Sequence, residues 1–155
     1  IGLYNANNIN AAIAIGNHFS VSTEFIKLAI ENYIPENNRS QLVHKNSNEI
    51  ILDAYNANPS SMAVAIANFI QLDKKGKVVI LGDMFELGHE SIVEHKGVVD
   101  LLVNEKNIEC YFIGNDFVKN KSDQQHFQFY ATFDEFATIV LKQQHFKNKM
   151  ILIAS

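Results

Sequence analysis

The sequence has little cysteine, no block of basic residues and no long apolar run, and each shortage excludes a class of protein. The single cysteine, Cys110, cannot form an internal disulfide, which fits a reducing compartment, and its place in an apolar run predicts a buried thiol. No apolar segment reaches the roughly 18 residues that a membrane-spanning helix needs. The first residues also lack the basic start and apolar core of a signal peptide. These features together fit a protein of a reducing compartment that is not embedded in a membrane.

Charge and composition exclude two further classes. The chain has 13 basic and 17 acidic residues, and with no basic cluster it offers no surface typical of nucleic-acid binding. Hydrophobic residues make up 47% of the chain, which is enough to bury a sizeable core and argues against disorder. A length of 155 residues suits one domain, or one domain with a piece of another. Because the chain begins at Ile1 rather than at Met, we expect it to be a fragment.

Residues 1–35 are predicted to be helical. A helix rich in Ala and Ile is expected over residues 9–15, and a second helix should start at Ser22 or Thr23 and end at Pro35. Two helices with a short lead-in cannot bury their own apolar faces, so this segment is expected to belong to a neighbouring domain.

Residues 36–155 show a different pattern, in which β-prone runs alternate with helical ones. A hairpin is predicted from the runs at 41–44 and 49–52. Further strands are predicted at 77–81, 109–113, 127–131 and 150–153, and helices at 62–72, 91–105 and 133–144. Repeated β-α-β units predict an α/β fold of the Rossmann-like type, with a mainly parallel sheet flanked by helices on both faces.

A polar turn, residues 53–61, separates the strand at 49–52 from the following helix. A parallel sheet places its binding chemistry at such turns, at the carboxyl ends of its strands. The amides of Asn56 and Asn58 offer donors and acceptors, whereas Asp53 offers acceptors. A capped turn, with Ser60 as the helix cap, would explain the same residues. Composition alone leaves both interpretations open.

A second polar turn, residues 82–88, follows the strand at 77–81. Asp83 and Glu86 place two carboxylates at one edge of the sheet, where they could contact the amine or the sugar of a ligand, or simply form a solvated turn. His95 lies nine residues after Glu86 and could face the same edge, although a lone His on a helix is more often a packing residue.

A third stretch, residues 4–12, is rich in asparagine. Side chains such as Asn5 and Asn8 could read an adenine edge through a paired donor and acceptor, or Asn7 or Asn8 could cap a helix. The chain has no P-loop, no dinucleotide fingerprint, no zinc-ligand spacing and no nucleophile-elbow serine. The residues alone therefore indicate an α/β domain with a polar edge that binds a ligand.

Taken together, these stretches resemble the Mur ligase family, and within it the ligases that add D-alanyl-D-alanine to a UDP-MurNAc-tripeptide. Sister ligases and folylpolyglutamate synthases have different sequences at the turn after Asp53, so this turn is the most specific part of the match. The matching motifs are Tyr4-Asn5-x-x-Asn8-x-x-Ala11-Ala12, Arg39, Asp53-x-Tyr55-Asn56-Ala57-Asn58-Pro59-x-Ser61-Met62, Leu81-Gly82-Asp83-Met84-x-Glu86-Leu87-Gly88 and His95.

The resemblance implies a cytoplasmic enzyme with three domains. Residues 1–35 would be the last helices of the central ATPase domain, and residues 36–155 most of the C-terminal domain. ATP would phosphorylate the carboxylate of the UDP-MurNAc-tripeptide, and the amine of D-Ala-D-Ala would displace the phosphate. Mg²⁺ would be held mainly by the missing upstream domain, together with the P-loop and the modified lysine of the family. The fragment alone would therefore be inactive, and the enzyme is expected to be a monomer.

The resemblance also implies roles for individual residues, none of them catalytic or metal-binding in this chain. ATP would be bound by Asn5 and Asn8 near adenine, Arg39 at the phosphates and Asp53 at the ribose hydroxyls. The D-Ala-D-Ala acceptor would be contacted by Tyr55, Asn56, Asn58, Asp83 and Glu86. The family's basic turn after the last strand has no counterpart before Ser155. Two alternatives remain: a ligase of the same superfamily with another amino substrate, and a flavodoxin-like binding module without chemistry of its own.

Overall fold

The computed structural model describes residues 6–35, 38–55, 57–142 and 146–155. The chain divides into two compact units, Ile1–Glu36 and Asn37–Ser155. Within the described ranges, no helix has both the length and the apolar character that crossing a membrane requires.

The first unit contains two helices, α1 (Ala6–His18) and α2 (Thr23–Glu31). The hydroxyl of Ser22 caps α2, since it accepts a hydrogen bond from the backbone N–H of Phe25 at 3.4 Å. The helices approach closely at Gly16, where a Cβ would lie 2.9 Å from the side chain of Ile26. Neither helix has a buried residue within its own unit.

The helix limits in this unit differ from those predicted. α1 begins at Ala6, so Asn7 and Asn8 lie in its first turn and do not cap it. α2 ends at Glu31, four residues before Pro35, where Asn32 forms the C-cap.

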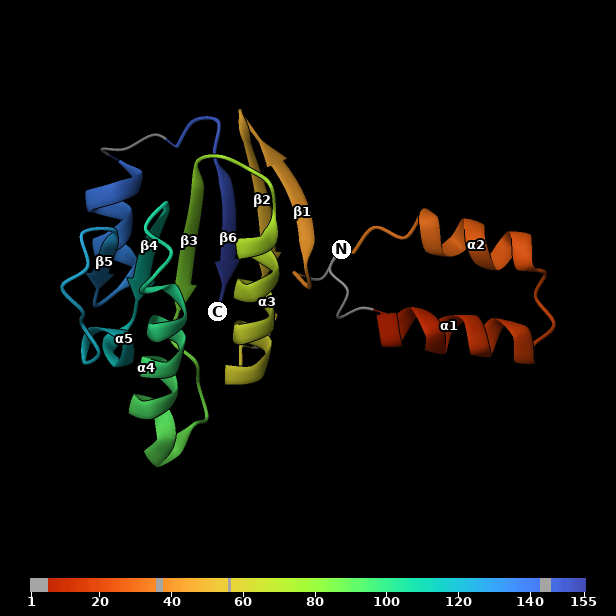
Figure 1. Cartoon of the computed structure of the whole chain (residues 1–155), viewed down its shortest axis with the longest axis horizontal. Helices are drawn as coiled ribbons and strands as arrows, with labels where there is room; N and C mark the ends of the chain where they lie inside the picture. The colour runs from red at the N-terminus through yellow and green to blue at the C-terminus, as the bar shows by residue number, and fades with distance from the viewer. Residues whose placement is uncertain (1–5, 36–37, 56, 143–145) are drawn as a thin grey trace. The chain divides into compact units, whose positions relative to one another are not determined.

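The second unit is built on a sheet whose strands, in the described part of the chain, number six and lie in the order β1-β2-β6-β3-β4-β5 (Figure 1). Only β1 is antiparallel, so the prediction of a mainly parallel sheet that opens with a hairpin is confirmed. The strands are β1 (Gln41–Lys45), β2 (Asn48–Asp53), β3 (Lys77–Gly82), β4 (Ile108–Ile113), β5 (Phe127–Tyr130) and β6 (Met150–Ala154). The helices are α3 (Pro59–Gln71), η2 (Gly88–Glu90), α4 (Ser91–Leu102), α5 (Asn115–Val118), α6 (Phe133–Phe136) and η3 (Ala137–Leu141).

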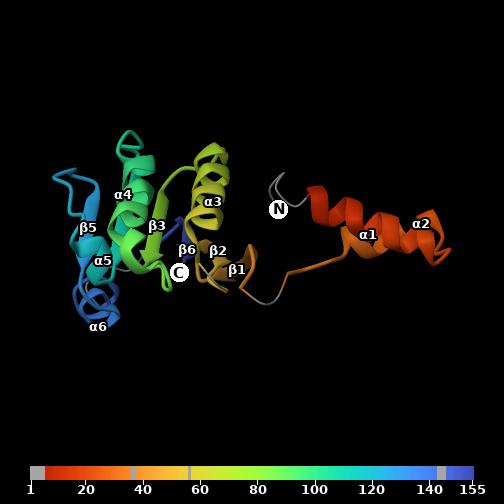
Figure 2. The ribbon, with the colours of Figure 1, turned by 90° about the horizontal axis from the view of Figure 1, so that it is seen from below.

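Helices cover both faces of the sheet, as the sequence predicts. Figure 2 shows α3 and α4 on one face and α6 on the other. β3 supplies both cores: Val79 and Leu81 pack beneath α3 and α4, whereas Val78 and Ile80 pack on the side of α6. A strand covered on both faces needs no polar alternation, which explains the continuous apolar run of β3. Cys110 is buried as expected, and burial raises the pKa of its thiol to about 12.

Three local predictions are corrected. The cap of α3 is Asn58 and not Ser60, because Pro59 takes the first helical position and the side chain of Asn58 accepts the N–H of Ser61 at 2.9 Å. α5 was not predicted, since four residues are too few to show a helical period. The helix predicted at 133–144 is α-helical over α6 and continues as π-helical turns in η3, whereas residues 143 and 144 of this prediction lie outside the described residues.

Candidate functional site

The two polar turns of unit 2 lie at one edge of the sheet, at the carboxyl ends of β2 and β3. Their strands are not neighbours, because β6 lies between them and pairs Ala154 with both Asp53 and Leu81. Adjacent strands are about 4.8 Å apart, so the backbones of the two turns are separated by about 10 Å at this edge. That spacing allows one extended ligand to contact both turns.

Asp53 ends β2 and is held by the segment that precedes β1. The hydroxyl of Ser40 donates to Oδ2 of Asp53 at 3.4 Å, and the N–H of Ala54 donates to the carbonyl of Asn38 at 2.8 Å. Burial raises the pKa of Asp53, and its hydrogen bonds with Ser40 and the charge of Arg39 offset part of this effect. The half-buried carboxylate therefore has acceptor capacity that its few protein donors do not use.

Arg39 stacks on Tyr55. The guanidinium carbon lies 3.8 Å from the centroid of the ring, and both side chains are exposed, Tyr55 by 61%. The guanidinium is thus held over the ring face, and its N–H groups make no hydrogen bond among the described residues. The pair therefore places a permanent positive charge beside Asp53.

Asn58 closes the turn by capping α3. Its side chain accepts the N–H of Ser61, and the hydroxyl of Ser61 accepts the N–H of Asn58 at 3.1 Å, which completes a reciprocal capping box. Asn58 is exposed, so its amide remains accessible to a ligand while it caps the helix.

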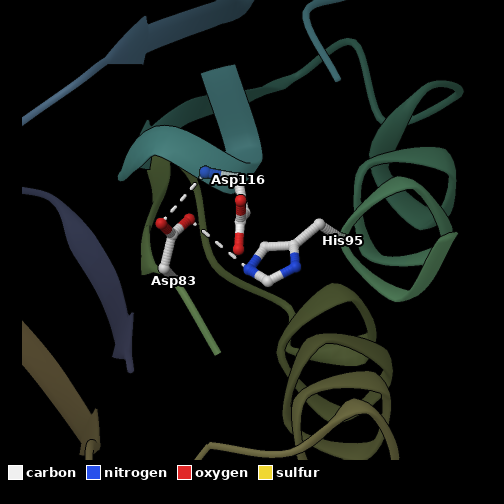
Figure 3. A group of neighbouring side chains, drawn as sticks. All are labelled: Asp83, His95 and Asp116. Atoms are coloured by element: carbon white, nitrogen blue, oxygen red, sulfur yellow. Dashed lines mark hydrogen bonds and ion pairs between the residues drawn. The ribbon is translucent and has the colours of Figure 1, made fainter. Parts of the chain in front are cut away.

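Asp83, the first residue after β3, points toward His95 and toward the backbone at Asp116 (Figure 3). Its two carboxylate oxygens accept the backbone N–H groups of Asp116 and Phe117, each at 3.1 Å, at the start of α5. Burial raises the pKa of Asp83, but the hydrogen bonds from His95, Asp116 and Phe117 outweigh it and hold the pKa below the ordinary 3.8. Asp83 therefore ties the turn after β3 to the turn after β4.

His95 projects from α4 into the same cluster and is completely buried. Its Nδ1 lies 2.7 Å from the carbonyl oxygen of Ser91, and its Nε2 lies 3.0 Å from the backbone N of Met84 and 3.4 Å from Oδ1 of Asp83. In the neutral ring Nδ1 donates to Ser91 and Nε2 accepts from Met84, whereas in the protonated ring Nε2 donates to Asp83. Burial lowers the pKa of His95, but Asp83 and the Ser91 carbonyl outweigh this effect and raise it above 6.5. The edge of the ring also packs on Phe117, with centroids 4.6 Å apart.

Asp83, His95 and Asp116 together present ligand atoms within 4.8 Å of one another, which is a spacing that a metal ion could use. Each group is already engaged by protein donors. Asp116 accepts from the hydroxyl of Ser91 and from Lys119, both at 2.6 Å, and Nε2 of His95 accepts from Met84. A cation would displace these bonds, so the geometry describes a hydrogen-bond network.

Three glycines and one strained residue shape this edge. At Gly82 a Cβ would lie 2.8 Å from the Cβ of Ser155, and at Gly114, which has φ 133°, it would overlap the carboxylate of Asp83. Glu86 has φ 63° and Gly88 has φ 55°, so the turn after β3 passes twice through the left-handed region. Glu86 is exposed at the tip of this turn.

The structure brings some of the predicted site residues together. Arg39, Asp53, Tyr55 and Asn58 surround the carboxyl end of β2, whereas Asp83 and Glu86 lie across β6 at the end of β3. Asn8 lies in the other unit, exposed in the first turn of α1. Asn5 and Asn56 fall outside the described residues.

Sequence reasoning missed part of the network. Ser91, Gly114 and Asp116 were not selected, although Gly114-Asn115-Asp116 directly follows a buried strand, as the other two polar turns do. That shared position was the signal that could have found them.

The fold and its edge define a Rossmann-like α/β domain with a polar site at the carboxyl ends of its parallel strands. The family model of the Mur ligase glutamate ligase domain matches residues 38–155. The chain therefore belongs to the Mur ligase family.

Individual relatives agree with this membership. The UDP-N-acetylmuramoyl-tripeptide--D-alanyl-D-alanine ligase of Treponema pallidum is 35% identical over 118 residues, which cover 76% of this chain and 26% of that protein. The crystal structure of MurF from Acinetobacter baumannii matches with a TM-score of 0.79 and 27% identity, covering 99% of this chain and 34% of that one. MurF ligase from Thermotoga maritima, solved in complex with ADP, has the same fold, with a TM-score of 0.75 and 21% identity over 96% of this chain and 34% of that one. The chain spans about a quarter of the length of the curated relatives that it matches.

Proposed function

We propose that this chain is the C-terminal part of a cytoplasmic, ATP-dependent ligase that joins D-alanyl-D-alanine to UDP-MurNAc-tripeptide during peptidoglycan precursor synthesis. The observation that carries the proposal is the string Asp53-x-Tyr55-Asn56-Ala57-Asn58-Pro59, placed at the carboxyl end of β2 in a Mur ligase domain. The relative from Treponema pallidum, which bears the name of this ligase, supports the choice within the family.

The reaction would proceed through an acyl phosphate. ATP would transfer its terminal phosphoryl group to the carboxylate of the tripeptide, and the free amine of D-Ala-D-Ala would attack the activated carbonyl. The tetrahedral intermediate would then release phosphate and leave a new amide bond. The described residues contribute binding and orientation to this sequence, which lowers the entropic part of the barrier.

The nucleotide half of the proposed site is formed by Asp53 and Arg39. The carboxylate of Asp53 would accept from both ribose hydroxyls, a role that its unused acceptor capacity supports. The N–H groups of Arg39 would bind phosphate oxygens, because a planar guanidinium suits bidentate recognition of such groups. Asn8, and Asn5 outside the described residues, would lie near adenine. ADP in the solved relative from Thermotoga maritima is consistent with a nucleotide site in this fold.

The acceptor half would be formed by Tyr55, Asn56 and Asn58, with Asp83 and Glu86 across β6. Glu86 is exposed and could meet the ammonium group of the dipeptide. Asp83 already accepts two backbone N–H groups, so in this proposal it holds the turn more than it contacts the ligand.

Mg²⁺ would offset charge on the phosphates. The cluster of Asp83, His95 and Asp116 does not fit this ion, because protein donors already occupy its ligand atoms. We assign Mg²⁺ to the upstream part of the enzyme, and we assign residues 1–35 to the central ATPase domain and residues 36–155 to the C-terminal domain. The enzyme would act as a monomer.

The test is a ligase assay of the full-length protein encoded by the gene. Phosphate release should require ATP, UDP-MurNAc-tripeptide and D-Ala-D-Ala together, and mass spectrometry should detect the pentapeptide product. D-Ala, L-Ala-L-Ala and single amino acids serve as competing acceptors. Ligation of one of these in preference to D-Ala-D-Ala would reassign the substrate, and no ligation with any acceptor would refute the proposal.

A further inference from the structure

The contact between Arg39 and Tyr55 joins residues that the proposed function places in different halves of the site. Arg39 belongs to the nucleotide half and Tyr55 to the acceptor half, yet the guanidinium carbon lies 3.8 Å from the ring centroid. A separation of this size is van der Waals contact, in the range where the electron-rich face of a ring attracts a cation.

The residues on both sides of Arg39 have an unusual backbone conformation that hydrogen bonds hold in place. Asn38 and Ser40 both lie in the left-handed region, with φ 53° and 49°. Such conformations are unfavourable for residues other than glycine, and they persist where surrounding contacts hold them. Here the carbonyl of Asn38 accepts from Ala54, and the hydroxyl of Ser40 donates to Asp53. One hydrogen bond on each side of Arg39 therefore anchors this segment to the end of β2.

The ring of Tyr55 is the one close partner of the guanidinium in the part of the chain that the structure describes. No carboxylate there lies within 4.0 Å of Arg39, and no hydrogen bond from its N–H groups is present among these residues. A long exposed side chain without a partner samples many rotamers. The ring restricts this freedom and leaves all the N–H donors available to an anion.

We propose that Tyr55 is a positioning residue for Arg39: it holds the guanidinium beside Asp53, ready for the phosphates of the nucleotide. The inference rests on the proposed function, and it assigns Tyr55 to nucleotide binding through Arg39 in place of direct contact with the dipeptide. The ring face carries this role, and the phenolic hydroxyl is not needed for it.

The test is a double-mutant cycle in the full-length enzyme, with KM measured separately for ATP and for D-Ala-D-Ala. Tyr55→Leu should raise the KM for ATP about two- to five-fold, the size of an exposed cation–π contact, and leave the KM for the dipeptide near its wild-type value. Tyr55→Phe keeps the ring and should restore the KM for ATP. In an Arg39→Ala background, Tyr55→Leu should have no further effect.

Phe133→Leu is the matched control, because it removes a ring that is 60% exposed at the start of α6, after β5, which is separated from β2 by three strands. The inference is overturned if Tyr55→Leu raises only the KM for the dipeptide, if Tyr55→Phe behaves like Tyr55→Leu, or if the effects of Tyr55→Leu and Arg39→Ala are additive. These results require an active wild-type ligase, so absence of ATP-dependent ligation in the wild type would count against the proposed function instead.

Discussion

The backbone N–H of Met84 donates a hydrogen bond to Nε2 of His95 across 3.0 Å, inside a cluster that excludes solvent from the ring. This bond connects the turn after β3 to α4. Since Nδ1 of the same ring donates to the carbonyl of Ser91, one side chain satisfies two buried backbone groups.

Replacing His95 with phenylalanine should destabilise the chain by about 2–3 kcal/mol, because the N–H of Met84 is left buried without an acceptor. His95→Gln offers an amide oxygen in its place and should lose less. Urea unfolding followed by circular dichroism measures the change. His89→Phe on the exposed turn is the matched control and should stay within about 0.5 kcal/mol of wild type. Equal losses at His89 and His95 would contradict this account.

The pair of His95 and Asp83 should make stability depend on pH. The raised pKa of His95 gives a contribution that is fully present below pH 6.5 and is lost as pH rises through the raised value. The lowered pKa of Asp83 gives a contribution that is present above pH 3.8 and is lost as pH falls through the lowered value. The difference in unfolding free energy between wild type and His95→Gln should therefore be largest between about pH 4 and 6.5.

The measurement for this pH dependence is a series of urea midpoints from pH 4 to 9. Above neutral pH the difference should shrink without vanishing, because the neutral ring still accepts from Met84. A difference that grows between pH 6 and 9 would show that the ring is stabilised in its neutral form only.

Asn58 should show a separation of its two roles. Asn58→Ala removes the cap of α3 and should cost about 1 kcal/mol, whereas Asn58→Ser keeps a capping oxygen and should cost less. Both variants lose the exposed amide, so in the full-length enzyme both should raise the KM for D-Ala-D-Ala about two- to ten-fold, the value of a hydrogen bond. If Asn58→Ser retains the wild-type KM, the amide does not contact the acceptor.

Asp53→Asn should weaken ATP binding without weakening the fold. Loss of charge-assisted bonds to the ribose should raise the KM for ATP at least about ten-fold, with little change in the KM for UDP-MurNAc-tripeptide. Because burial raises the pKa of Asp53, its charged form is disfavoured in the folded state, and the neutral amide should leave the melting temperature unchanged or slightly higher. Steady-state kinetics test the predicted rise in the KM for ATP, and thermal melts test the predicted effect on stability. An unchanged KM for ATP would show that Asp53 is not part of the nucleotide site.

Gly114→Ala should destabilise the chain by more than about 2 kcal/mol. The residue has φ 133°, and an added Cβ would overlap the carboxylate of Asp83. Gly97→Ala in α4 is the matched control, since a Cβ there meets no atom within 4 Å and should stabilise the helix by up to about 1 kcal/mol. The melting temperature should fall in Gly114→Ala and rise in Gly97→Ala. If Gly114→Ala leaves the melting temperature unchanged, the carboxylate of Asp83 can move away from the added Cβ.

Much of the fold could be predicted because apolar runs and their periods are local. The hairpin, the strands and the helices α3 and α4 follow from such runs, within a few residues at their ends. The exact cap of α3 did not, because Ser60 and Asn58 are both good capping residues and only Pro59 at the first helical position distinguishes them. The π-helical turns of η3 depend on bonds such as that from Lys142 to Ala137, which no periodicity reveals.

The site was predictable where its residues are adjacent in sequence and unpredictable where they are not. The turn after Asp53 has its polar side chains on a few consecutive residues, so the sequence alone singles it out. Asp83, in contrast, bonds with backbone groups 33 and 34 residues later, and nothing in its own neighbourhood indicates this. The stacking of Arg39 on Tyr55 likewise depends on how the segment before β1 returns to the end of β2.

The position of β6 in the middle of the sheet determines the order in which the strands can pair as the chain is synthesised. A chain is synthesised from its N-terminus, so β1-β2 and β3-β4-β5 emerge first, and each carries an open backbone edge until residues 150–154 arrive. β6 then pairs with β2 on one side and with β3 on the other, and so closes both of these edges. The two polar turns acquire their fixed separation only when β6 pairs with both strands, and until then the open edges of β2 and β3 can pair with another chain.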